Sequence, residues 1–350
     1  MRWPRLRVLA EGRLLAGVTE VDVISNNHFA ADRFSVTAAL GADPVGLRAL
    51  AGRAEILIDV QASLGDGTGF ESLVKGEVDA LDLDPLQGVL RLEGRDLSAR
   101  LIEARTHETF ANRTASEIAV ELAGRHGLTA DVQPTTTPVG RYWQLQHDRI
   151  MFDQFGRATT EWDLLATLAQ LEGFDVWASG DVLHFRPQAT EARAYRLRPG
   201  DVTGLRLERA LTLARDIEVT VKSWNSRQQN AFVQTARKRA VPKGRGQAQR
   251  YVVMIPNLTP AEALRIAQER LAELSRHERV VVAEMPGELD IRPRGLVSLT
   301  GTGTDFDQHY RVDRVERRIS AAHGFSQTVR MRNASEASSA ARQEVKWTDF

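Results

Sequence analysis

Histidine followed by glutamate is the pairing in this sequence that comes nearest to a metalloprotease motif. It occurs at His107-Glu108 and at His277-Glu278. The H-E-x-x-H motif needs a second histidine four residues after the first, so that one helix face presents two nitrogens to a zinc ion. Neither pair has that second histidine, and the eight histidines are otherwise scattered. The sequence therefore predicts no zinc hydrolase.

Three glycines at alternate positions, Gly65, Gly67 and Gly69, superficially resemble a phosphate-binding loop. They lack the G-x-G-x-x-G spacing and the strand-to-helix context in which a helix N-terminus would hold the phosphate. The pattern favours a hairpin turn. The G-x-S-x-G nucleophile elbow, which places a reactive serine between a strand and a helix, does not occur in the sequence.

Thiol chemistry is excluded because the chain has no cysteine, which also fits assembly in a reducing cytoplasm. Carboxylate pairs are too common among 46 acidic residues to indicate a glycosidase. Asp79, Asp82 and Asp84 precede Pro85 and favour a solvated turn over a cation site. We therefore expect no enzyme, no metal site and no bound cofactor.

Charge is balanced over the whole chain, with 46 basic and 46 acidic residues, so no global field attracts nucleic acid or an anionic membrane. No apolar run approaches the roughly 20 residues of a membrane span. The strongest local signal is the segment 222–250, which has eight Lys or Arg, including Arg237-Lys238-Arg239, and no acid. Two interpretations stay open: a solvated loop, or a contact for an acidic protein surface or passing nucleic acid. Few aromatic residues lie in this segment, so it offers few side chains on which nucleic-acid bases could stack.

A glycine-rich turn near the C-terminus is the main structural motif. Gly301 and Gly303 separate two predicted strands, and Phe306 and Tyr310 follow them. Glycine supplies positive φ without steric cost, and an aromatic side chain just beyond a turn can cover it from one side. We interpret these four residues as a structural turn and expect positive φ for at least one of the two glycines.

The order of strand, glycine turn, aromatic residue and strand also occurs in the first hundred residues. The interval from Phe70 to Gly88 is 18 residues, and so is the interval from Phe306 to Gly324. Such internal similarity predicts one β module used twice. Chance is the alternative, because strand–turn–strand is a common pattern.

Hydrophobic periodicity divides the rest of the chain. Residues 1–100 alternate at period two and predict short strands in a small barrel or sandwich. Residues 101–200 predict an α/β domain: helices begin after Thr114 and Thr160, and a hairpin covers 174–186.

Strands return after this domain, and the cleanest alternation of the chain covers residues 216–223. A helix is then predicted to begin after Thr259, because the sequence combines a capping box with Pro260 at the first helical position. We expect this helix to end near His277.

The period is ambiguous just after the glycine-rich turn. Val312, Val315 and Ile319 have helical spacing, but the flanking glycine turns leave little room for a helix. We interpret this segment as a strand, with a bulge immediately after Asp313.

Three blocks of sequence stand out, at residues 94–102 with 110–119, at 215–225, and at 299–306 with 310–316. Together they resemble the late-control D, or baseplate-hub, proteins of contractile-tailed phages. No single block is diagnostic, but their order and spacing cover residues 90–332. Before residue 90 the likeness is one of layout.

The resemblance implies a mainly β fold with two related β-barrels, the second interrupted by an insertion, and a small α/β helper domain. The implied domains are a first barrel (1–100), the helper domain (101–200), a second barrel (201–225 and 280–332), an insertion with the basic loop and a helix (226–279) and a tail (333–350). It also implies a homotrimer. Two similar barrels per chain would give six similar units, which match a six-fold tail tube on one face and a three-fold spike on the other.

The partners that the resemblance implies are further copies of the chain, the tail tube protein, the central spike protein, the tape measure protein and the baseplate wedge proteins. DNA would only pass through the channel. The implied location is the tail baseplate of a virion, assembled in the bacterial host cytoplasm. This role needs surfaces and no catalytic group.

Other functions stay open. A hub component of a type VI-like or other contractile injection system would have the same physical role. An OB-like nucleic-acid-binding module fits less well, because the net charge is zero and no stacking platform is evident. An enzyme such as a cell-wall hydrolase comes third.

The last residues carry a separate hypothesis. The segment 333–344 is polar and lacks apolar periodicity, yet Trp347 and Phe350 follow it. This end is either frayed, or it crosses to a neighbouring chain or a spike and inserts Trp347 into an apolar pocket. Trp347, Phe350 and the basic run at 237–239 are the candidate partner contacts.

Overall fold

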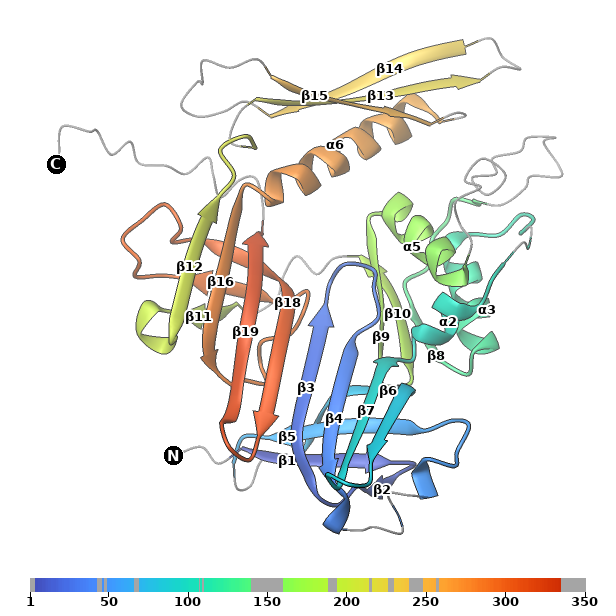
Figure 1. Ribbon diagram of the computed structural model, residues 1–350. Helices are drawn as coiled ribbons and strands as arrows, with labels where there is room; N and C mark the ends of the chain where they lie inside the picture. Colours follow the sequence, from blue (N-terminus) through green and yellow to red (C-terminus); the bar gives the residue numbers. More distant parts are fainter. Residues whose placement is uncertain are drawn as a thin grey trace. The chain divides into compact units, whose positions relative to one another are not determined.

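The computed structural model describes residues 4–42, 46, 49–65, 69–106, 108, 110–139, 160–187, 194–213, 216–225, 230–238, 248–255 and 258–334. The chain is mainly β, as the sequence predicts (Figure 1). It divides into two compact units, each built from several stretches of chain. The first unit contains residues 1–191, 284–294 and 313–329, and the second contains 192–283, 295–312 and 330–350. Among the described helices, none is long and apolar enough to cross a membrane.

The first unit contains most of the strands. They are β1 (Arg5–Ala10), β2 (Arg13–Leu14), β3 (Val18–Asn26), β4 (Arg33–Ala39), β5 (Leu57–Ser63), β6 (Glu71–Asp84), β7 (Val89–Asp96), β8 (Thr129–Val132), β9 (Phe174–Ser179) and β10 (Val182–Pro187). Its helices are α2 (Ala99–Glu103), α3 (Ala115–Arg125) and α5 (Glu161–Glu172), with a 3-10 turn η1 (Leu40–Ala42).

The second unit contains a longer helix. Its elements are β11 (Tyr195–Leu197), η2 (Pro199–Asp201), β12 (Gly204–Arg209), β13 (Ile217–Asn225), β14 (Asn230–Lys238), β15 (Gln249–Met254), α6 (Pro260–Arg276) and β17 (Leu296–Leu299). Three strands contribute residues to both units: β16 (Arg279–Pro286), β18 (His309–Ser320) and β19 (Gly324–Asn333).

The sheet of the first unit is an antiparallel path in the order β18-β3-β4-β7-β6-β5-β1-β2. Alternate residues point inward, so that Val21, Val23, Val36 and Leu92 are buried in one apolar cluster. In the described residues the path stays open at the two-residue strand β2, and no closed barrel forms. The prediction of a mainly β fold is confirmed, whereas the two predicted β-barrels are not, because no closed barrel forms among the described residues.

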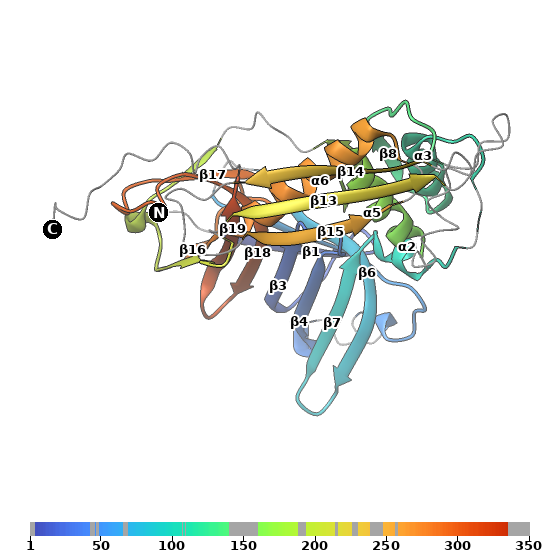
Figure 2. The same cartoon turned by 90° about the horizontal axis from the view of Figure 1, so that it is seen from above.

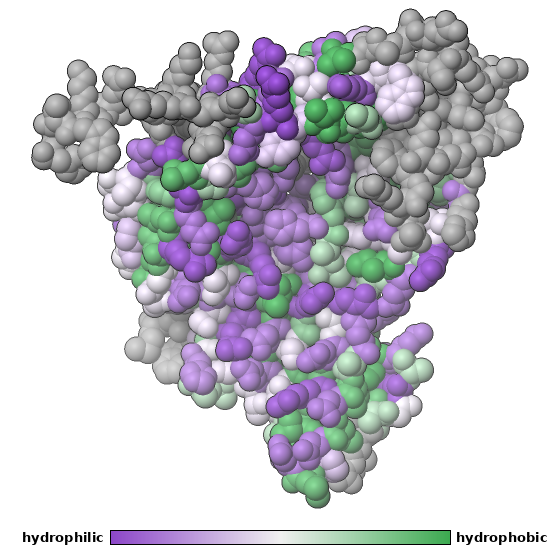
Figure 3. All heavy atoms as spheres, turned by 45° about the horizontal axis from the view of Figure 1, so that its top comes forward, coloured by the Kyte–Doolittle hydropathy of each residue, from purple (hydrophilic) through white to green (hydrophobic). Residues whose placement is uncertain are grey.

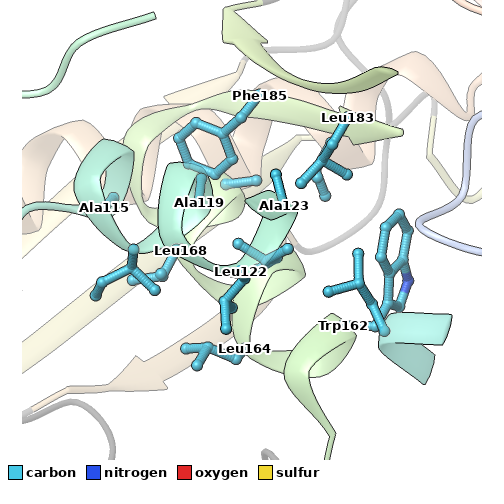
Figure 4. Packing of buried hydrophobic residues seen from close by; sticks show 14 of the residues in the cluster. Ala115, Ala119, Leu122, Ala123, Trp162, Leu164, Leu168, Leu183 and Phe185 are labelled. Carbon is cyan, nitrogen blue, oxygen red and sulfur yellow. The ribbon is translucent and has the colours of Figure 1, made fainter. Parts of the chain in front are cut away.

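The helper region has its own core, made by α2, α3, α5 and the strands β8–β10. Thr114 caps α3 in a capping box with Glu117, and the Thr160 side chain caps α5, as their sequence positions predict. Figure 4 shows side chains from α3, α5 and β10, including Leu122, Leu168 and Phe185, turned toward one interior. The predicted hairpin is β9–β10, in which Ser179 pairs with Val182.

In the second unit, β14, β13 and β15 form a three-stranded sheet that is separate from β12. Helix α6 lies along one face of it (Figures 1 and 2) and buries Ile217, Val219 and Val221 of β13 against Ile266. Strand β13 therefore joins the predicted insertion rather than the strands of 280–332. Both predicted start signals of α6 are present, because Thr259 forms a capping box and Pro260 is the first helical residue.

Residues 309–320 form strand β18, so the interpretation as a strand is confirmed. The register with β3 runs without a shift from Arg314 to Ser320. The bulge immediately after Asp313 stays a prediction, because this register begins at Arg314. Residues 310–313 are all buried, and Asp313 and Arg317 take inward positions. Polar residues at inward positions gave the segment its helix-like hydrophobic spacing.

The two similar segments share local topology. Strand β6 pairs with both β5 and β7, and β18 pairs with both β17 and β19. Strand β18 also pairs with β3, along residues 314–320. Gly88 lies in the turn before β7 and Gly324 is the first residue of β19, and their φ angles are 69° and 72°. The centre of the first glycine turn, residues 66–68, lies outside the described residues.

Candidate functional site

The glycine-rich turn is held by an aspartate that follows it. Gly301 and Gly303 have φ angles of 86° and 67°, as expected for a turn that needs positive φ. The backbone N–H groups of Thr302 and Gly303 donate to the Asp307 carboxylate over 3.0 and 3.1 Å. Burial acts to raise the pKa of Asp307, but these hydrogen bonds and that of the Thr302 hydroxyl hold it below its usual value.

The two aromatic residues after the turn also belong to it. Tyr310 is fully buried and its hydroxyl donates to the Phe306 carbonyl over 2.9 Å. Burial raises the pKa of Tyr310 to about 12. The Arg279 guanidinium lies 5.7 Å from the Phe306 ring centroid, and its Nη1 donates to the Asp305 carbonyl over 2.8 Å. The four predicted turn residues therefore lie together, and Arg279 is a buried support that sequence reasoning missed.

The basic run is only partly described. Arg237 forms an ion pair with Glu218 at 2.9 Å, and Lys238 forms one with Glu278 at 3.0 Å. Arg239, Trp347 and Phe350 lie outside the described residues. Their role as partner contacts stays a prediction.

The face of the β13–β15 sheet opposite α6 carries large exposed apolar side chains, and we call it the open sheet face. Trp224, Val233, Val252 and Met254 are 44%, 55%, 53% and 64% exposed. Figure 3, which brings the top of Figure 1 forward, shows hydrophobic and strongly hydrophilic atoms side by side in this region. An exposed apolar group of this kind is typical of a protein-contact surface.

The first unit contains a cleft of about 670 Å³ with polar and apolar walls, which we call the arginine cleft. It is lined by Ser25, Asp32, Glu71, Ser72, Leu73, Gln133, Asp175, Trp177, Ala178, Ser179, Arg186, Pro187, Leu289, Arg292, Pro293, Arg294 and Arg317. No sequence motif marks any of these residues as functional. In the described part of the chain, no group of three or more His, Cys, Asp or Glu is placed to hold a metal ion.

Trp177 forms one wall of the arginine cleft. Its ring stacks on His184 with 4.6 Å between ring centroids. The Arg294 guanidinium lies 4.4 Å from the centroid of the Trp177 ring. Arg294 has a φ of 68°, which is uncommon for a residue other than glycine. The backbone therefore takes a strained conformation at the residue whose side chain contacts Trp177.

Two aspartates share hydrogen bonds beside this arginine. The Asp32 N–H donates to Oδ2 of Asp96 over 2.8 Å, and the Asn26 N–H donates to Oδ1 of Asp32 over 2.9 Å. Burial and the charge of Asp96 raise the pKa of Asp32 to about 7, while Asn26 and Arg294 act in the opposite direction. Burial also raises the pKa of Asp96. The pair therefore takes up a proton more readily than exposed aspartates do.

Arg317 points inward from β18 and is 4% exposed. Its Nη2 donates to the Ile291 carbonyl, and its Nε has no hydrogen-bond partner among the described residues. Burial and the nearby charge of Arg292 lower the pKa of Arg317 to about 10. The cleft therefore offers a buried guanidinium with an N–H donor that no described residue uses.

Solved structures identify the fold. The tail protein from Neisseria meningitidis MC58 has a TM-score of 0.70 at 14% identity, with 97% of this chain and 99% of that chain covered. The 43 kDa tail protein of prophage MuSo2 from Shewanella oneidensis has a TM-score of 0.68 at 15% identity, with 94% and 98% covered. Identities this low show the fold alone.

A secretion component has a related fold. The E. coli c3393 protein, described as a component of the type VI secretion system with structural similarity to the T4 tail proteins gp27 and gp5, has a TM-score of 0.56. Its identity is 13%, with 94% of this chain and 77% of that chain covered.

Sequence comparisons give a different description. No curated protein matches the chain. The model of a family described as the Alg8 N-terminal domain matches residues 70–321, more than half of the chain, and the chain belongs to this family. That description states neither an activity nor a partner, and it does not name the late-control D proteins that the sequence resembles.

Proposed function

We propose that the chain is a structural component of a phage-type tail, and that it acts as the hub of a contractile baseplate. The observation that carries this proposal is the fold likeness to the Neisseria tail protein, which extends over nearly the whole of both chains. The role is non-enzymatic, since it needs contact surfaces and a channel.

In the finer form of the proposal, three copies form a ring around a channel. The repeated arrangement of β5–β6–β7 and β17–β18–β19 supports it, because two similar modules per chain give six per trimer. Six similar modules suit a six-fold tail tube, and three copies suit a three-fold spike. The further proposed partners are the tape measure protein and the baseplate wedge proteins, and DNA passes through the channel. The proposed location is the tail of a virion.

The mass of the purified chain in solution, measured by light scattering, tests the ring. The expected result is a trimer, or a monomer that becomes a trimer when the spike protein is added, because partner binding shifts assembly by mass action. A stable dimer or hexamer, alone or with the spike, would contradict the ring. The tail role is tested separately by imaging particles with labelled antibody, which should mark one end of the tail.

The C-terminal segment supplies the proposed partner contact. Trp347 and Phe350 dock on a neighbouring chain or on the spike. A second proposed contact is the basic run, in which Arg237, Lys238 and Arg239 contact an acidic surface.

A truncation tests the C-terminal contact. Asn333 is 2% exposed and its Oδ1 accepts a 3.0 Å hydrogen bond from Gln308, so the truncation should keep Asn333. A chain that ends at Ala334 should fold normally but assemble poorly.

The control for this truncation is Trp347→Ala in the full chain, which removes the anchor and leaves the polar segment in place. Both variants should show the same loss of assembly and an unchanged melting temperature. Assembly at the level of the full chain in both would end the anchor hypothesis.

A type VI-like hub is the second candidate, favoured by the fold likeness to the E. coli secretion component. The physical role would be that of a hub in both cases, but the hub would belong to an injection system instead of a phage tail. Purification of the chain with a tail that carries a DNA-filled head supports the phage role. Recovery of the chain only in sheathed tubes without a head supports the injection system.

A further inference from the structure

We propose that the arginine cleft binds an acidic peptide segment, and that the buried guanidinium of Arg317 receives one of its carboxylates. The cleft belongs entirely to the first unit. The inference does not depend on the proposed function, because it concerns a binding site that the single chain contains.

The first argument is the state of Arg317. Its side chain is nearly fully buried and lines the cleft, but its described hydrogen bond goes to the neutral carbonyl of Ile291. Its Nε–H has no partner among the described residues. A buried guanidinium in this state is costly, and a carboxylate matches its fork of N–H donors.

The second argument is the neighbouring charge. The side chain of Arg292 is 64% exposed and forms an ion pair with Glu71. The positive charge of Arg292 lies close enough to Arg317 to lower its pKa. Two guanidinium groups of like charge repel each other. The nearby carboxylates of Asp32, Glu71 and Glu288 offset this only in part, because burial and the charge of Arg292 still lower the pKa of Arg317. A peptide carboxylate at Arg317 would reduce this repulsion.

The carboxylates on the cleft wall are already engaged. Glu71 pairs with Arg292, and Asp175 is 5% exposed and within electrostatic reach of Arg294. Asp32 accepts the N–H of Asn26, and its raised pKa leaves a large share of it neutral near pH 7. Arg317 is therefore a buried guanidinium on the cleft wall with an N–H donor that has no partner among the described residues.

The third argument is size. A cleft of about 670 Å³ lies within the roughly 300–1,000 Å³ typical of ligand sites and far exceeds the volume of one small anion. Leu73, Trp177, Ala178 and Leu289 give it apolar surface beside the arginines. A peptide segment fills such a space, whereas acetate or phosphate alone does not.

Calorimetry with two peptides tests the proposal on the full chain. The probes are acetylated, amidated hexaglutamate and the matching neutral hexaglutamine. Hexaglutamate should bind at least about tenfold more tightly than hexaglutamine. Equal affinities, or no binding of hexaglutamate, would overturn the proposal.

Adjacent arginines on β18 provide a matched pair of variants. Arg317→Gln should reduce hexaglutamate affinity at least about tenfold. Arg318→Gln should leave it unchanged, because Arg318 is 60% exposed and pairs with Asp22 on the other side of the strand. If Arg317→Gln fails to fold, Arg292→Gln replaces it, since this exposed residue at the cleft is removable without opening the core. Unchanged affinity in the folded variant would overturn the proposal.

Competition with small anions and the pH dependence of binding test the nature and the position of the ligand. Inorganic phosphate or acetate that binds as tightly as hexaglutamate would overturn the assignment to a peptide. Affinity should also fall from pH 6 to pH 8, because Asp32 ionises beside Asp96, Arg294, Ser25 and the Asn26 N–H and its negative charge then acts on Arg317 as well. The decline should be absent in Asp32→Asn, and a decline of the same size there would contradict the placement of the ligand beside Asp32.

Discussion

Arg332 donates a 2.6 Å hydrogen bond from Nη1 to Oε1 of Glu273, and thereby joins the last strand β19 to helix α6. A hydrogen bond with His277 and the charges of Arg332 and Arg276 lower the pKa of Glu273 to about 2, against the effect of partial burial. Because this pKa is depressed in the folded chain, the ionised carboxylate stabilises the fold above its unfolded pKa near 4.5. That contribution is lost as the pH falls toward 2.

Glu273→Gln should therefore lower the free energy of unfolding at pH 6, and the difference from the unaltered chain should shrink by pH 3. Urea unfolding at the two pH values measures it. The control is Glu269→Gln, which removes an exposed i,i+4 pair with Arg265 and should cost no more than about 0.5 kcal/mol. A Glu273→Gln difference that is as large at pH 3 as at pH 6 would refute the linkage.

Asp32 should act in the opposite direction. Its pKa is raised to about 7 in the folded chain, chiefly by burial, so the protonated form stabilises the fold at low pH. This contribution should be lost as the pH rises from about 4 to about 7. Asp32→Asn should flatten that part of the stability profile, measured as the melting temperature between pH 4 and pH 8. A profile that keeps its slope in the variant would show that another group carries the effect.

Gly94 should not tolerate a methyl group. A Cβ built there would lie 2.1 Å from the Glu77 carbonyl oxygen and 2.5 Å from Cζ of Phe34. Gly94→Ala should therefore destabilise the chain by about 2 kcal/mol or more, because a packed sheet relaxes only partly. Gly124→Ala is the control, since a Cβ on this helical glycine meets nothing within 4 Å and should stabilise α3 by up to about 1 kcal/mol. Chemical denaturation of both variants gives the comparison, and equal effects would contradict the packing argument.

The glycine-rich turn has a backbone requirement instead of a packing requirement. Gly301→Ala and Gly303→Ala should each cost on the order of 1 kcal/mol, because both residues have positive φ. Gly200→Ala provides a reference without that angle, and its effect should stay within about 0.5 kcal/mol. The denaturant midpoints of the three variants measure these differences. If both turn variants have the same midpoint as Gly200→Ala, glycine is not required at positions 301 and 303.

Local signals in the sequence predicted local structure well. The start of α3 after Thr114 and the start of α6 after Thr259 follow from side chains that bond the adjacent backbone. The strand β18 followed from the length available between two glycine turns. In each case the deciding interaction lies within a few residues.

Pairing between distant segments was not predictable in the same way. The alternation in β13 shows that it is a strand with one buried face, but not which sheet it joins, and the structure places it with β14 and β15. The arginine cleft was missed because Asp32, Trp177 and Arg317 come from separate parts of the sequence. The available signal was Arg317 itself, a charged residue at an inward position of a strand.

The interleaved composition of the two units has a consequence for synthesis on the ribosome. Residues 1–191 lack partners that are encoded only at 284–294 and 313–329, so the first unit is incomplete until Val329 has left the exit tunnel. At a typical rate of about 5–20 residues per second, the edge of β3 stays unpaired in the nascent chain for roughly 15–60 seconds. Strand β18 is the element that pairs with that edge. During synthesis this edge is therefore exposed to pairing with other strands until β18 is available.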